Sequence, residues 1–138
     1  MELSRRETLA LGLGAAVMAL VPFRANAAAA DAISAFTGGA EMADGGVSLT
    51  APEIAENGNT VPIEVSAPGA VSILIVAAGN PEPGVATFNF GPLAAEQAAS
   101  TRIRLAGTQD VIAVAKMADG NFAKASATVK VTIGGCGG

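Results

Sequence analysis

From Val47 onward the chain alternates apolar and polar residues, and this period of two constrains the fold more than any other feature. The alternation is cleanest at 128–133, where the sequence reads Thr-Val-Lys-Val-Thr-Ile. A period of two with many β-branched residues is typical of a strand that buries one face. Similar runs recur at 61–65, 71–75, 85–90, 101–105 and 111–117. We therefore expect an all-β fold.

Short motifs rich in Gly, Pro, Asn and Asp separate these runs. Asp119-Gly120 is expected to form a hairpin turn, because both residues tolerate positive φ. Six or seven short strands with this spacing predict an antiparallel β-sandwich. Pro62 cannot donate a hydrogen bond to a neighbouring strand, so we expect it on an edge strand or at a bulge.

The first 27 residues have the organisation of a secretory signal peptide. Ser4-Arg5-Arg6 gives a charged start, the stretch 9–23 is apolar, and Ala25-Asn26-Ala27 is a small-residue cleavage site. The paired arginines suggest the twin-arginine route, although Thr8 stands where a bulky residue is usual. The alternative is an uncleaved membrane anchor, for which the apolar run is short and rich in glycine. We expect removal of residues 1–27, with cleavage near Ala27.

The mature chain of about 110 residues is long enough for one small core. The alanine-rich stretch 28–36 is expected to form a short helix, with Thr37-Gly38-Gly39 as its stop signal. A loop rich in Gly and Asp follows through Gly46. The predicted organisation is a helix and loop at 28–46, a β-sandwich at 47–133 and a C-terminal arm at 134–138.

Two of the strand runs are apolar on both faces. Their outward side chains are expected to be Leu74, Val76, Ile112 and Val114. Such a set forms an exposed apolar patch unless something covers it. One explanation is a partner subunit, and the other is a cover supplied by a loop or by the N-terminal segment.

Several residue types that support catalysis are missing. The chain has no His, Trp or Tyr and a single Cys, which excludes the usual zinc and most transition-metal sites and any histidine general base. No EF-hand, Walker or dinucleotide motif occurs, so no cofactor is expected. The mature chain has ten acidic and five scattered basic residues, which argues against nucleic acid as a partner.

The only cysteine lies in a terminal run of glycines, Gly134-Gly135-Cys136-Gly137-Gly138. Glycine-rich backbone at a terminus is expected to form a flexible arm, slim enough to enter a narrow cleft. An ordinary thiol has a pKa of about 8.5, and no cation flanks Cys136 to lower it. This pattern indicates an attachment point that other proteins activate.

Two other interpretations of Cys136 remain open. An exported structural or adhesion module could use it for an intermolecular disulfide, since an odd cysteine is typical of such pairing. A thiol enzyme is the third interpretation, and the missing base and cation argue against it.

Stretches 129–138, 51–62 and 100–105 together resemble the SoxY family, the sulfur-carrying subunits of the periplasmic thiosulfate-oxidising (Sox) system. The resemblance implies an immunoglobulin-like sandwich, a SoxZ-like partner in a heterodimer, and no membrane span in the mature form. It also implies that Cys136 carries thiosulfate-derived sulfur, while Gly134, Gly135, Gly137 and Gly138 supply reach. The carrier itself would not be an enzyme. SoxAX-type, SoxB-type and sulfane-dehydrogenase-type enzymes would load, hydrolyse and oxidise the cargo.

Overall fold

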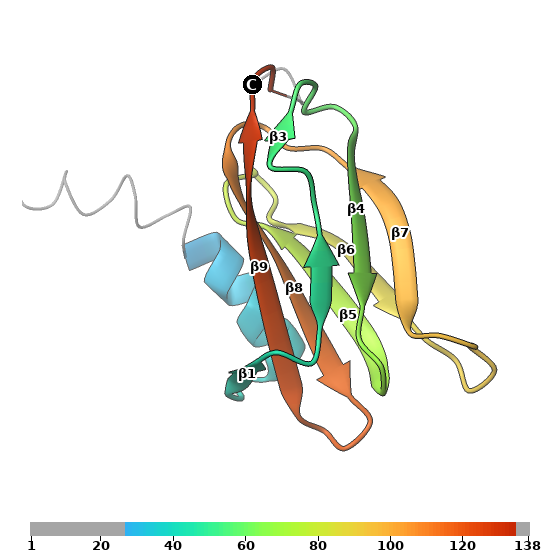
Figure 1. The fold of residues 1–138 in the computed structure, drawn as a ribbon. Coiled ribbons are helices and arrows are strands. Elements are labelled where there is room, and N and C mark those ends of the chain that lie inside the picture. Colours follow the sequence, from blue (N-terminus) through green and yellow to red (C-terminus); the bar gives the residue numbers. More distant parts are fainter. Residues whose placement is uncertain (1–26, 135–138) are drawn as a thin grey trace, which may run out of the picture.

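The computed structural model describes residues 27–134, which fold into a two-layer β-sandwich with one N-terminal helix (Figure 1). The larger sheet has the strand order β1-β9-β8-β5-β6, with β3 also paired to β9, and the smaller sheet has the order β2-β4-β7. The strands are β1 (Met42–Asp44), β2 (Ser48–Thr50), β3 (Ile54–Ala55), β4 (Val61–Ser66), β5 (Ala70–Ala77), β6 (Gly84–Asn89), β7 (Ala98–Ile103), β8 (Gln109–Met117) and β9 (Phe122–Val131). This is the predicted all-β, immunoglobulin-like architecture.

The described range leaves out most of the predicted signal peptide and the last four residues. Gly135, Cys136, Gly137 and Gly138 therefore lie outside the described residues, as does the predicted flexibility of the arm. Gly134 is the one arm residue within them.

Every strand expected from the alternation is present, but some bounds differ. β9 begins at Phe122, six residues before the predicted run, because the inward positions Ala123, Ala125 and Ala127 are too small to give a clear apolar alternation. Asp119-Gly120 forms the predicted turn between β8 and β9, with Gly120 at a φ of 89°. The 28–46 segment is more than a helix and a loop, since β1 lies within it and pairs with β9 in parallel.

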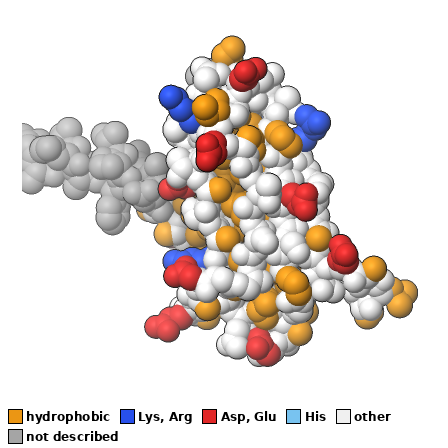
Figure 2. Space-filling view, in the orientation of Figure 1, with side chains coloured by type: hydrophobic (Ala, Val, Ile, Leu, Met, Phe, Trp, Pro, Cys, Tyr) orange, Lys and Arg blue, Asp and Glu red, His pale blue; other side chains and the backbone are white. Residues whose placement is uncertain are grey.

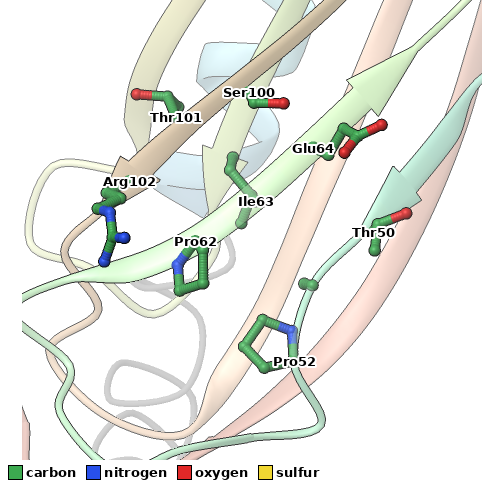
Figure 3. Close-up of a pocket in the computed structure, with 9 residues that line it drawn as sticks. Thr50, Pro52, Pro62, Ile63, Glu64, Ser100, Thr101 and Arg102 are labelled. Carbon is green, nitrogen blue, oxygen red and sulfur yellow. The ribbon is translucent and has the colours of Figure 1, made fainter.

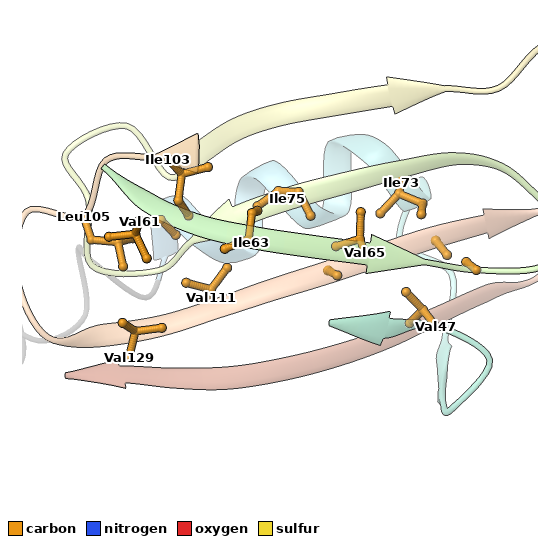
Figure 4. Packing of buried hydrophobic residues seen from close by; sticks show 14 of the residues in the cluster. Val47, Val61, Ile63, Val65, Ile73, Ile75, Ile103, Leu105, Val111 and Val129 are labelled. Atoms are coloured by element: carbon orange, nitrogen blue, oxygen red, sulfur yellow. The ribbon is translucent and has the colours of Figure 1, made fainter. Parts of the chain in front are cut away.

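The main core lies between the two sheets (Figure 4). Its large side chains alternate along the strands, as a period of two requires. They include Val61, Ile63, Val65, Ile73, Ile75, Ile103, Leu105, Val111 and Val129. Val61, Ile73, Ile75, Leu105, Val111 and Val129 have no exposed surface, so the sandwich is closed around an aliphatic centre.

The N-terminal helix, residues 27–37, covers the outer face of the larger sheet (Figure 1). Leu74, Val76 and Val114 are buried there with Phe122. The helix packs Ile33 and Phe36 and two alanines against them, and Ile112 is half-buried at the margin. The expectation of a partner subunit on this patch is therefore wrong, and the alternative cover by the N-terminal segment is correct. Three or four apolar side chains on one face of the helix are enough to cover this apolar patch.

Two local predictions need correction. Pro62 does not lie on an edge strand, because β4 runs between β2 and β7. Pairing with β2 stops at Glu64, however, so Pro62 pairs only with Arg102 of β7. The amide hydrogen that proline lacks is therefore not needed for a hydrogen bond to β2. The alternation at 71–75 puts Val71 on the same inner face as Ile73 and Ile75, but Val71 is 41% exposed. A register shift between Ala70 and Ser72 turns it outward.

Candidate functional site

The base of the C-terminal arm is fixed to the body by hydrogen bonds to the backbone. Thr132 donates from its amide to the carbonyl of Ala55, at 3.0 Å, and from its hydroxyl to the carbonyl of Glu56, at 2.9 Å. The amide of Gly58 then donates to the carbonyl of Ile133, at 2.7 Å. The chain is thus held through Ile133, two residues beyond the end of β9.

Gly134 lies directly against the backbone of Ala106. A Cβ built on Gly134 would overlap the Ala106 carbonyl oxygen, and this neighbour is backbone, which cannot rotate away. Glycine is therefore required here by close approach as well as by any need for flexibility. The first residue of the predicted arm is thus held against the sandwich.

Two amide side chains, the half-buried Asn80 and the buried Gln109, hold the loop that Gly134 touches. Asn80 accepts a hydrogen bond from the amide of Ala106 at 2.9 Å and donates to the carbonyl of Arg104 at 2.8 Å. Gln109 donates to Asn80 Oδ1 at 2.8 Å and accepts from the amide of Gly79 at 2.8 Å. Because Gln109 is only 8% exposed, these bonds satisfy polar groups that have little access to water. The pair was not predicted from the sequence, because a single Asn and a single Gln carry no periodic signal.

A groove with a cavity volume of about 550 Å³ crosses the smaller sheet (Figure 3). Its lining combines prolines, hydroxyls, one basic and one acidic side chain. The lining residues are Thr50, Ala51, Pro52, Pro62, Ile63, Glu64, Ser100, Thr101 and Arg102. Arg102 and Arg104 are both exposed, as expected for the polar positions of the alternating run at 101–105. Arg102 donates a hydrogen bond to the hydroxyl of Thr60 at 3.4 Å.

Within residues 27–134 no group of three or more acidic, His or Cys side chains is placed to hold a metal ion. In the same part of the chain, no helix has the length and apolar character needed to cross a membrane.

A family model described as "Sulfur oxidation protein SoxY" matches residues 33–136, which is most of the chain. The chain belongs to the SoxY family. The match ends at Cys136, so it includes the cysteine that sequence analysis singled out. The family places this protein among the sulfur carriers of the Sox system.

Solved structures agree with the SoxY assignment. The sulfur carrier protein SoxY from Chlorobium limicola f thiosulfatophilum matches with 38% identity and a TM-score of 0.65, over 75% of this chain and 94% of that one. A superoxide reductase (neelaredoxin) from Ignicoccus hospitalis matches with 18% identity and a TM-score of 0.54, over 63% of this chain and 80% of that one. At that identity the second likeness shows a shared sandwich fold alone. No curated protein matches the chain.

Of the predicted site residues, the structure describes Gly134 alone, and this residue lies against the backbone of Ala106. Two further residues at this end escaped prediction because strand alternation does not report exposure at a strand end. Ile133 was expected in the final strand, but it lies beyond β9 and is 67% exposed. Ile54 of β3 pairs with Lys130 at the same end and is 58% exposed.

Proposed function

We propose that this SoxY-family chain carries thiosulfate-derived sulfur covalently on Cys136 and presents it to the Sox enzymes. The observation that carries the proposal is the family match, which continues through the glycine-flanked cysteine to residue 136. The fixed base at Ile133 and Gly134 supports it, because such a base gives a carrier arm a defined origin.

The chemistry requires only a thiol from the carrier. A SoxAX-type enzyme would join the Cys136 thiolate to thiosulfate with a new S–S bond, and two electrons would leave to that enzyme's acceptor. A SoxB-type hydrolase would then add water, releasing sulfate and two protons and leaving a persulfide on the cysteine. A sulfane-dehydrogenase-type enzyme would oxidise this remaining sulfur where it is present. None of these steps needs a base or a metal from the carrier.

The glycines supply reach in this scheme. Extended backbone spans at most about 3.5 Å per residue, so Cys136 lies within roughly 10 Å of the fixed Ile133. Gly135 and Gly137 on either side present no side chain to the wall of a partner's cleft. We propose that residues 134–138 act as a flexible arm that enters the active sites of several enzymes in turn.

The chain is proposed to work in the periplasm after removal of residues 1–27, in a heterodimer with a SoxZ-like subunit. The partner does not need the face of Leu74 and Val76, since the N-terminal helix already buries it. Contacts with the enzymes would be transient, which allows one arm to serve several active sites.

The test is thiosulfate-dependent cytochrome c reduction by purified Sox partner proteins with the carrier added. We expect Cys136→Ser to abolish reduction while its unfolding temperature stays at the wild-type value. Retained reduction with the Cys136→Ser chain would overturn the proposal. The N-terminal residue of the periplasmic protein, measured by mass spectrometry, tests the cleavage site near Ala27.

A further inference from the structure

The groove on the smaller sheet has a basic end and an acidic end. Arg102 pairs with Pro62 across β7 and β4, and Glu64 pairs with Ser100 two residues further along. Figure 3 shows the Arg102 side chain extending from β7 toward β4 beside Pro62, while Glu64 lies toward the other end. An anion in this groove is therefore drawn to the Arg102 end and repelled from the Glu64 end.

The basic end of the groove lies next to the base of the arm. Gly58, which donates to the carbonyl of Ile133, stands two residues before Thr60. Two extended residues span about 7 Å, and the Arg102 guanidinium lies 3.4 Å from the Thr60 hydroxyl. Cys136 reaches roughly 10 Å from Ile133, and each S–S bond of a bound cargo adds about 2 Å. The cargo can therefore reach the guanidinium without any movement of the sandwich.

Charge makes this contact selective for the loaded arm. The mature chain is acidic, and Glu53 and Glu56 lie on the segment that holds the arm base. Figure 2 shows basic side chains only on the two flanks of this end, with acidic ones between them. A neutral thiol gains nothing from a guanidinium, whereas a sulfonate offers three acceptor oxygens that match its donor fork. Within residues 27–134, Arg102 donates its hydrogen bond to a neutral hydroxyl, so its charge is available to an anion.

We propose that Arg102 binds the sulfonate end of the cargo on Cys136, so that the loaded arm rests in the groove between enzyme visits. This inference rests on the proposed function, because it takes a thiosulfate-derived anion as the cargo. Arg102 is a positioning residue in this account and takes no part in bond making. The exposed site implies a weak and salt-sensitive contact, which suits an arm that must be released to each enzyme.

The test uses chemical loading, so that it does not depend on any Sox enzyme. Tetrathionate reacts with a thiolate to give the cysteine S-thiosulfonate, and one thiosulfate ion leaves as the old S–S bond breaks and the new one forms. The mature chain labelled with ¹⁵N is compared before and after loading. The readouts are the guanidinium Nε–H resonances of Arg102 and Arg104 and the relaxation of the Gly135, Gly137 and Gly138 amides.

We expect loading to shift the Arg102 resonance and slow the motion of the three glycine amides. Both changes should disappear at about 1 M salt, where the screening length is about 3 Å, and in Arg102→Gln. The matched control is Lys116→Gln, which also removes one positive charge. Lys116 lies near the end of β8 that pairs with Phe122, far from the arm base, so both changes should remain in this variant. Cys136→Ser treated with tetrathionate should show neither change.

Three outcomes would overturn the proposal. In the first, the Arg102 resonance does not move on loading. In the second, the glycine amides slow equally in Arg102→Gln, or Arg104 rather than Arg102 responds. In the third, the unloaded chain shows the full effect, which means that the arm enters the groove without any cargo. If the chain fails in cytochrome c reduction but passes this test, the carrier function is wrong and the anion contact stands as a property of the chain.

Discussion

Gly134 packs against the carbonyl group of Ala106 so closely that no side chain fits between them. This contact holds the first residue of the predicted arm against the sandwich. The Ala106 loop is itself held by Asn80 and Gln109, so their hydrogen bonds fix the backbone that Gly134 meets. The position of the arm base is thus a property of the sandwich.

The first prediction concerns Gly134→Ala. The new Cβ must displace the Ala106 carbonyl or pull Ile133 away from Gly58. We expect a loss of about 1 kcal/mol in the free energy of unfolding and faster hydrogen exchange at the Gly58 amide. Gly91→Ala is the control, since Gly91 has open space around it. Unchanged exchange at Gly58 in Gly134→Ala would contradict the proposed role of this contact.

The second prediction concerns the hydrogen-bonded amide side chains of Asn80 and Gln109. Gln109→Ala leaves the Gly79 amide without its acceptor and removes one of the hydrogen bonds to Asn80 Oδ1. We expect a loss of about 2 kcal/mol in the free energy of unfolding, measured by urea denaturation. Gln97→Ala removes an exposed acceptor of the Gly69 amide and should change stability by under about 0.5 kcal/mol. Equal losses of unfolding free energy in the two variants would show that the hydrogen bonds of Gln109 contribute no more to stability than an exposed hydrogen bond does.

The third prediction concerns the helix over the outer sheet face. Phe36 meets Phe122 edge to face, with ring centroids 6.0 Å apart. Phe36 is half-buried, so Phe36→Ala should cost about 2 kcal/mol of unfolding free energy, below the value for a fully buried ring. It should also increase binding of a dye that reports exposed apolar surface. Ser34→Ala, on the exposed side of the same helix, is the control and should change neither the stability nor the dye binding. If Phe36→Ala leaves dye binding unchanged, the helix does not cover the apolar face as described.

The strands were predictable because they follow a period of two, and the exceptions have local causes. A register shift turns Val71 outward, and small residues conceal the first half of β9. The apolar pattern indicated that Leu74 and Val76 need a cover, but it did not specify which segment provides it. That choice depends on the helix packing angle, which no sequence period encodes.

The arm was predictable from its composition, and its anchoring was not. Glycine at 134 suggested freedom, whereas the structure shows a close approach to Ala106. The contacts that fix it join residues such as Gly58 and Ile133, which are far apart in the sequence and polar only through their backbone. Single-sequence patterns do not report such pairings.

The fourth prediction tests the arm. Val at both Gly135 and Gly137 adds branched side chains and restricts the backbone on either side of the cysteine. We expect loading by a SoxAX-type enzyme to slow by at least about tenfold, with the unfolding temperature unchanged. Loading by tetrathionate, a small reagent with no cleft, is the control and should keep its wild-type rate. An unaltered enzymatic rate would argue against entry of the arm into a narrow site.

The most direct measurement is the intact mass of the carrier after thiosulfate turnover with its partner proteins, followed by mapping of the C-terminal peptide. The account predicts adducts of thiosulfate-derived sulfur on the peptide that contains Cys136, and none on the Cys136→Ser chain. Finding only the free thiol and a disulfide-linked dimer would contradict it.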